Sequence, residues 1–172
     1  MSSRLILDTK ELARFLVRAK KNAWAGDRGK TQPERAGFKE YIFTDGEWSY
    51  RDSYVGFYCA PGQEIVRFQE QPVWTMSYDG GMAQEFWEDE NFARETFVFL
   101  KKALLQVEES MPFRGPERYE ESNLVYKNCL IDGDIRRFEG EESIISTSTD
   151  ALIFQQKYIG GLIVTKGGIE IK

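Results

Sequence analysis

Asp52 lies among aromatic residues at alternate positions, and this spacing makes it the strongest candidate for a functional acid. Successive side chains of a β-strand point to opposite faces. Trp48, Tyr50, Asp52 and Tyr54 therefore share one face of a predicted strand over residues 47–55. A bare carboxylate is costly to bury among aromatic rings. Asp52 is predicted to be hydrogen-bonded, paired or functional, unless it faces water from an edge strand.

A second predicted strand, residues 73–78, places Trp74 and Tyr78 on one face in the same way. Aromatic residues make up 14% of the chain. They indicate either a sheet-rich core, because aromatic residues suit strands, or an aromatic-lined pocket. In the second interpretation Trp74 and Tyr78 join the Asp52 face as ligand contacts.

Three further charged residues have spacings that suggest chemistry. Glu64 and Glu142 each follow a glycine near the start of a predicted strand, and Arg114 lies in a Met-Pro-Phe-Arg-Gly-Pro break. Two facing carboxylates can form an acid/base pair or a hard-cation site. They can equally accept backbone N–H groups and stabilise the fold. Arg114 either binds an anion or holds the turn between a helix and a strand.

The residue types that the chain lacks exclude several kinds of catalytic, metal and cofactor sites. The chain contains no histidine, which removes the commonest general base and the commonest metal ligand. Its two cysteines, Cys59 and Cys129, are too few for a zinc cluster or a disulfide scaffold. No glycine run has the spacing of a nucleotide-binding loop. We therefore expect no metal, no cofactor and no assigned catalytic residue, and we lean against an enzyme.

Charge is unevenly distributed along the chain. The net charge is −5, yet the first 35 residues carry nine Lys and Arg against four Asp and Glu. This basic segment indicates either the solvated face of an amphipathic helix or a contact with an anionic partner. No stretch is long and apolar enough for a membrane span, and no signal peptide is evident. We expect a cytoplasmic protein that binds neither membranes nor nucleic acid directly.

Hydrophobic periodicity predicts two amphipathic helices, over residues 9–24 and 92–108. Each is followed by a run of short strands. Asp45-Gly46 is a strong hairpin signal, and a second turn is expected around Gln71-Pro72. The tail, residues 162–172, is predicted to form a short hairpin over Gly167-Gly168 or to fray.

The two halves of the chain resemble each other. Gly62-Gln63-Glu64 matches Gly140-Glu141-Glu142, and Tyr78-x-Gly80-Gly81 matches Tyr158-x-Gly160-Gly161. The predicted fold class is therefore α+β, with a helix plus a four-stranded antiparallel meander occurring twice about a pseudo-twofold axis. Residues 1–172 are expected to form a single domain of two repeats, about 8–82 and 91–162, with a short tail. A cleft is expected between the halves or between helix and sheet.

Several segments resemble an uncharacterised prokaryotic family of unknown function. They are Phe15-Leu16-x-x-Ala19-Lys20, Trp74-x-Met76-x-Tyr78-x-Gly80, Met111-Pro112-Phe113-Arg114-Gly115-Pro116 and Phe138-x-Gly140-x-Glu142. In that family the domain stands alone or follows a Cro-like helix-turn-helix segment, which implies a sensor or dimerisation role in the fused members. The order of elements is also similar in shape to cystatin-like α-β4 units. Shape does not settle function.

These observations leave three hypotheses. The first is a non-catalytic small-molecule-binding or sensor-type domain, the second is a protein-interaction or dimerisation module, and the third is a carboxylate enzyme. The expected partners are accordingly a small-molecule ligand or a second copy in a homodimer. The ligand contacts expected under the first hypothesis are Trp48, Tyr50, Asp52, Tyr54, Glu64, Trp74, Tyr78, Arg114 and Glu142.

Overall fold

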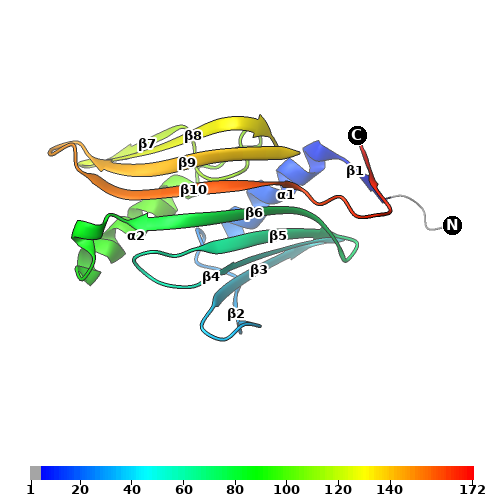
Figure 1. Cartoon of the computed structure of the whole chain (residues 1–172), viewed down its shortest axis with the longest axis horizontal. Helices are drawn as coiled ribbons and strands as arrows, with labels where there is room; N and C mark the ends of the chain where they lie inside the picture. The colour runs from blue at the N-terminus through cyan, green and yellow to red at the C-terminus, as the bar shows by residue number, and fades with distance from the viewer. Residues whose placement is uncertain (1–4) are drawn as a thin grey trace.

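One nine-stranded antiparallel sheet dominates the computed structural model, which describes residues 5–172 (Figure 1). Its strands in chain order are β2 (Lys30–Thr31), β3 (Lys39–Asp45), β4 (Trp48–Tyr54), β5 (Gly62–Phe68), β6 (Gln71–Met82), β7 (Arg118–Glu121), β8 (Leu124–Asp134), β9 (Arg137–Ser146) and β10 (Leu152–Leu162). Across the sheet the order is β2-β3-β4-β5-β6-β10-β9-β8-β7. Of the strands that pair in this sheet, β6 and β10 are the most distant in sequence, and they meet in its middle.

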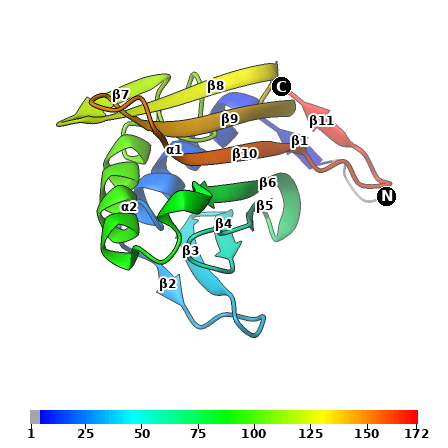
Figure 2. The same cartoon turned by 60° about the vertical axis from the view of Figure 1, so that its left-hand side comes forward.

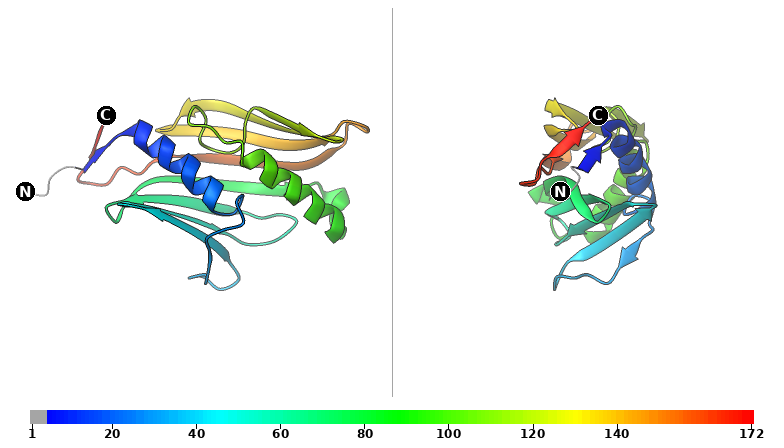
Figure 3. Two further views of the ribbon diagram at one scale, coloured as in Figure 1. Left: turned by 180° about the vertical axis from the view of Figure 1, so that it is seen from behind. Right: turned by 90° about the vertical axis from the view of Figure 1, so that its right-hand side faces the viewer.

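Two helices lie across the same face of this sheet (Figure 3). They are α1 (Thr9–Asn22) and α2 (Glu90–Leu104), and the short 3-10 helix η1 (Gln84–Phe86) precedes the second. The Asp8 side chain caps α1 by accepting hydrogen bonds from the backbone N–H groups of Lys10 and Glu11. The Asp89 side chain caps α2 by accepting one from the N–H group of Phe92. Both predicted helices are thus confirmed, with ends that differ by a few residues. Neither described helix is long and apolar enough to cross a membrane.

The predicted fold class, a duplicated helix-plus-four-strand unit with pseudo-twofold symmetry, is wrong. The chain is mostly strand, and its long strands join edge to edge in one continuous sheet through the β6–β10 ladder. The physical reason is that periodicity identifies strands and their buried faces, but it does not determine whether two runs pair at their edges or stack face to face. The expected cleft between two halves consequently has no basis.

The turns show where local signals were reliable. Asp45-Gly46 ends β3 and starts the tight connection to β4, as predicted. The turn expected at Gln71-Pro72 instead falls at Gln69 and Glu70, whose φ angles are 50° and 62°. Two consecutive left-handed residues form a mirror-image hairpin turn, which normally favours Gly and Asn. The sequence therefore carries no clear signal at the true position.

The C-terminal tail does not form the predicted hairpin. Strand β11 (Ile169–Ile171) pairs in parallel with β1 (Leu5–Leu7), a strand that the sequence did not indicate. Figure 2 shows the two strands side by side at one end of the molecule. Leu7 is fully buried there, so this small second sheet anchors the start of α1.

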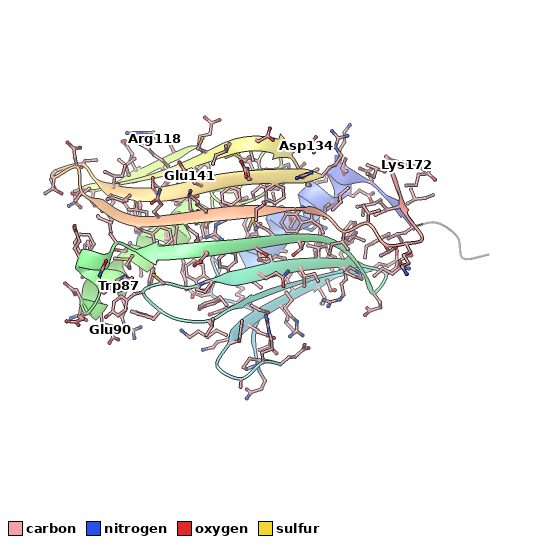
Figure 4. The ribbon with its side chains drawn as sticks, in the orientation of Figure 1. Trp87, Glu90, Arg118, Asp134, Glu141 and Lys172 are labelled. Carbon is pink, nitrogen blue, oxygen red and sulfur yellow. The ribbon has the colours of Figure 1, made fainter. Side chains whose placement is uncertain are left out.

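The core consists of two apolar clusters on the helix-covered face. One lies under α1 and includes Phe15, Leu16 and Trp74. The other lies under α2 and includes Phe99 and Leu100. Trp24, just after α1, packs against both clusters, and the site described below opens at this boundary. The opposite face of the sheet carries charged side chains such as Glu141, while Trp87 and Lys172 mark the two ends of the molecule (Figure 4).

Candidate functional site

A cleft of about 700 Å³ opens between α2, the segment after α1, and the helix-facing side of the sheet. This volume lies within the range of roughly 300–1,000 Å³ that is typical of ligand sites. Strands β3, β4, β6 and β10 all contribute to its wall and floor. Seven aromatic side chains line it: Trp24, Tyr41, Tyr54, Phe57, Tyr78, Phe97 and Phe154. The cleft therefore offers an apolar body to a ligand.

Asp52 and Tyr78 form the polar part of the cleft floor. The Tyr78 hydroxyl donates a hydrogen bond of 2.5 Å to Oδ1 of Asp52. Both residues are buried, with 6% and 9% of their surface exposed. A short O–H···O contact to a carboxylate is a strong, charge-assisted interaction. The alternating pattern of β4 and β6 directs both side chains to the helix-covered face.

Burial, together with the neighbouring Glu64 carboxylate, raises the pKa of Asp52 from 3.8 to about 7. The Tyr78 hydrogen bond, Arg114 and Lys20 act in the opposite direction without cancelling this effect. Burial also holds the pKa of the Tyr78 phenol well above its usual value. The Tyr78 phenol consequently keeps its proton, while the Asp52 carboxyl gains or loses its proton near neutral pH.

Beneath the floor, a buried cluster of charges joins α1 to three strands. Arg114 Nη2 lies 2.7 Å from Oε1 of Glu142 and 3.2 Å from the side-chain oxygen of Gln156. Lys20 pairs with Glu64, and Arg114 reaches the same carboxylate at 3.8 Å. Burial lowers the pKa of Lys20. The cluster leaves no fully buried side-chain nitrogen or oxygen without a partner among residues 5–172.

A small chamber of about 30 Å³ adjoins the cleft and is lined by Lys20, Tyr50, Asp52, Glu64 and Arg114, among others. Its volume is enough for one water molecule. Asp52 and Arg114 line both spaces. The Asp52 carboxyl therefore stands at the junction between the open cleft and the buried charges.

Five cationic side chains surround the mouth of the cleft: Lys30, Lys39, Arg94, Lys101 and Lys102. Three of them pair with carboxylates, namely Arg94 with Glu90, Lys101 with Asp27 and Lys102 with Glu121. Among the described residues, Lys30 and Lys39 have no carboxylate partner. Lys39 instead donates to the Gly56 carbonyl at 3.2 Å. Cations also lie over rings of the wall, with Lys101 4.9 Å from the Trp24 centroid and Lys39 5.4 Å from that of Tyr54.

Comparison with known proteins places residues 52–163 in the family described as Domain of unknown function (DUF5680). The chain belongs to this family. The sequence-based recognition of a family of unknown function is thereby confirmed, while nothing in the match concerns Cro-like segments or cystatins. No curated protein and no solved structure matches the chain. Within this DUF5680 chain the matched region contains Asp52, Tyr78 and Arg114, whereas Trp24 precedes it.

The ligand contacts expected from the sequence occupy three different places. Asp52, Tyr54, Tyr78 and Arg114 line the cleft of this DUF5680 domain. Tyr50 and Glu64 line the small chamber. The remaining three lie elsewhere: Trp48 stacks on Phe15 in the core, Trp74 is fully buried and donates to the Ile135 carbonyl, and Glu142 is buried against Arg114 and Tyr126.

The open alternatives for the charged residues have structural answers. Arg114 holds the connection between α2 and β7 through Glu142 and Gln156, and it also reaches the cleft. Glu64 and Glu142 accept side-chain cations rather than backbone N–H groups. Among the described residues, no group of three or more Cys, Asp and Glu side chains is arranged to hold a metal ion.

Sequence reasoning missed most of the wall and the mouth. Trp24, Phe57 and Phe97 come from a helix end, a loop and α2, and only the chain path brings them together. Lys30 belongs to the basic N-terminal segment, for which the sequence indicates either a solvated helix face or a contact with an anionic partner. That charge imbalance was the one available signal for the mouth.

Proposed function

We propose that this domain binds a small amphipathic anion in the cleft between α2 and the sheet. The observation that carries the proposal is an aromatic cleft whose mouth holds two lysines, Lys30 and Lys39, without carboxylate partners among the described residues. Aromatic walls favour a flat apolar body, and cations at the rim favour a carboxylate, sulfonate or phosphate on the outer end.

The cationic residues at the mouth of the cleft support the binding of an anion. The whole chain carries a net charge of −5, so a cationic mouth does not follow from bulk composition. Charges at a cleft entrance that are opposite in sign to the ligand raise its local concentration and its rate of association. The mouth cations also pack over wall aromatics, as Arg94 does at 5.4 Å from the Phe57 ring centroid. Their positions are therefore constrained before any ligand arrives.

Two fluorescent dyes test the proposal directly. 8-Anilino-1-naphthalenesulfonate and N-phenyl-1-naphthylamine share the same rings, and only the first carries a sulfonate. We expect saturable binding of the sulfonate dye with one molecule per chain and weaker binding of the neutral dye. The double substitution Lys30→Glu/Lys39→Glu should weaken sulfonate binding by about tenfold, since each rim charge contributes modestly.

The matched control is Lys127→Glu/Lys157→Glu, which makes the same change in net charge at exposed positions of β8 and β10. This control should leave dye binding unchanged. Equal effects of the two double substitutions, or equal affinity for the two dyes, would remove the anionic part of the proposal. Absence of saturable binding by either dye would remove the ligand-binding function.

Asp52 favours a second candidate function, a proton-transfer enzyme. Its buried carboxyl has a pKa near 7 at the floor of a cleft, the property expected of a general acid or base. In such a step Asp52 takes a proton from a C–H group next to a carbonyl, the C–H electron pair forms an enolate, and the proton returns to the same or a neighbouring carbon.

Deuterium exchange separates this candidate from simple binding. Anionic aryl ketones incubated with the protein in heavy water would lose the proton signals next to the carbonyl, and Asp52→Asn would abolish that loss. Dye binding without exchange of any such ketone would leave only the non-catalytic function.

A further inference from the structure

The contact between Tyr78 and Asp52 has a counterpart elsewhere in the sheet. Tyr158 on β10 donates its hydroxyl to Oδ1 of Asn128 on β8 at 2.8 Å. In both cases the tyrosine is paired in register with a glycine of the intervening strand, Gly62 for Tyr78 and Gly140 for Tyr158. Each tyrosine ring therefore crosses the neighbouring strand at a glycine, which has no side chain. Its hydroxyl then reaches an Asp or Asn on the strand after that one.

Asp52 and Asn128 differ in the hydrogen bonding of their second polar side-chain atom. Nδ2 of Asn128 donates to the Gly115 carbonyl at 2.8 Å, so both polar atoms of that amide are bonded within the protein. Oδ2 of Asp52 accepts no hydrogen bond from the described residues. No fully buried side-chain oxygen in this part of the chain lacks a partner, so Oδ2 keeps contact with the open space that Asp52 lines, which is the cleft together with the small chamber beside it.

The other acceptors of the floor are already engaged. Gln156, which also lines the cleft, turns its side-chain oxygen to Arg114. Tyr78 uses its proton on Asp52. An acceptor that faces a cleft without a protein donor is satisfied by water or by a ligand, since leaving it unpaired on binding weakens that binding.

We propose that the molecule bound in the cleft carries a hydroxyl or amine at its inner end, which donates to Oδ2 of Asp52. The inference rests on the proposed function and makes it more specific. The ligand class is then an elongated molecule with an anionic group for Lys30 and Lys39, an apolar body for the aromatic wall, and a hydrogen-bond donor for the floor. Above pH 7, where the Asp52 carboxyl is ionised, a ligand that ends in an ether or a methyl group leaves Oδ2 without a partner.

A matched series of acids tests this requirement. The 4-hydroxyphenyl and 4-methoxyphenyl alkanoates with one to five methylene groups share the anion and the ring, and differ in the donor at the far end. We expect the hydroxy acids to displace the sulfonate dye more strongly, by about fivefold or more at the best chain length. The range of lengths covers different spans between the mouth and the floor.

Asp52→Asn supplies the second measurement. The amide can still accept from Tyr78, as Asn128 accepts from Tyr158, but its nitrogen is a donor, so the preference for hydroxy acids should disappear. Asp79→Asn makes the same change at an exposed position of β6 and should keep the preference.

Equal displacement by hydroxy and methoxy acids at every length would overturn the inference, as would a preference that survives in Asp52→Asn. Either result, obtained with intact dye binding, leaves the proposed function standing. Failure of the dyes themselves removes both. The comparison of acids on the unsubstituted protein is decisive even if Asp52→Asn does not fold.

Discussion

The Tyr78 hydroxyl lies across Gly62 and donates to Asp52 Oδ1 at 2.5 Å. Asp52 is on β4, Tyr78 is on β6, and Gly62 belongs to the strand between them. A side chain on Gly62 would occupy the space that the phenol needs. The cleft floor thus depends on a residue that contributes no side chain of its own.

Gly62→Ala should destabilise the protein and disorder the cleft floor. The new methyl group would lie 2.5 Å from Cζ of Tyr78 and 2.8 Å from the Ser53 carbonyl oxygen. Overpacking of this kind costs about 1–3 kcal/mol, measurable by urea unfolding. Gly167→Ala is the control, because its nearest neighbour would be Thr165 Oγ1 at 3.8 Å. Equal stability of the two variants would contradict the packing described for Tyr78.

The Asp52 carboxyl should titrate near pH 7 by carbon-detected NMR. Glu64 raises this pKa and Lys20 lowers it, so substitutions at the two positions should act in opposite directions. Glu64→Gln should move the midpoint down, and Lys20→Met should move it up. Shifts in the same direction for both variants would show that their effect is structural rather than electrostatic.

Stability should fall as pH rises through the range set by Asp52. The folded pKa of about 7 lies above the unfolded value of 3.8, so the folded state binds more protons between these values. The contribution is complete below pH 3.8 and is lost as pH rises through 7. At ~1.4 kcal/mol per pKa unit, it amounts to at most a few kcal/mol.

Asp52→Asn removes this titration. Comparing the variant with the native chain therefore separates the contribution of Asp52 from those of other titrating groups. The difference in unfolding free energy, variant minus native chain, should become more favourable to the variant from pH 5 to pH 8. Urea unfolding at the two pH values measures the difference. Parallel stability profiles for the two proteins would mean that Asp52 has an ordinary pKa.

Glu142→Gln should be severely destabilising. Glu142 is 1% exposed and accepts hydrogen bonds from Arg114 and Tyr126. Removing its charge leaves Glu64, at 3.8 Å, as the remaining carboxylate near the buried Arg114 guanidinium among the described residues, and breaking a buried pair in this way costs about 3–5 kcal/mol. Glu120→Gln breaks the exposed pair with Arg118 and should have no measurable effect on thermal unfolding.

Much of the local structure was predictable because its signals are local. Alternation grouped Asp52 with Tyr50 on β4 and Tyr78 with Trp74 on β6, and helix periodicity located α1 and α2. The pairing of β6 with β10 was not predictable, because an antiparallel edge carries no mark of its partner in a single sequence. The same limit applies to β1 and β11, which are separated by almost the whole chain.

The candidate site was predictable only in part for a related reason. Asp52 stood out because a carboxylate among aromatic residues requires an explanation. Trp48 and Trp74 share faces with it, yet α1 covers Trp48 through Phe15, and Trp74 stacks on Phe138. Which aromatic residues meet the cleft is decided by where α1 ends and α2 begins, and side-chain alternation contains no information about helix placement.

Trp24 gives the cleft an optical reporter of its own. Its indole borders the cleft, while Trp48 and Trp74 lie in the core and Trp87 stands near α2 at the far end of the molecule. An occupant that displaces water from the indole, or moves the Lys101 ammonium above it, will alter the emission of one tryptophan out of four. Native fluorescence therefore allows candidate metabolites to be surveyed without any attached label.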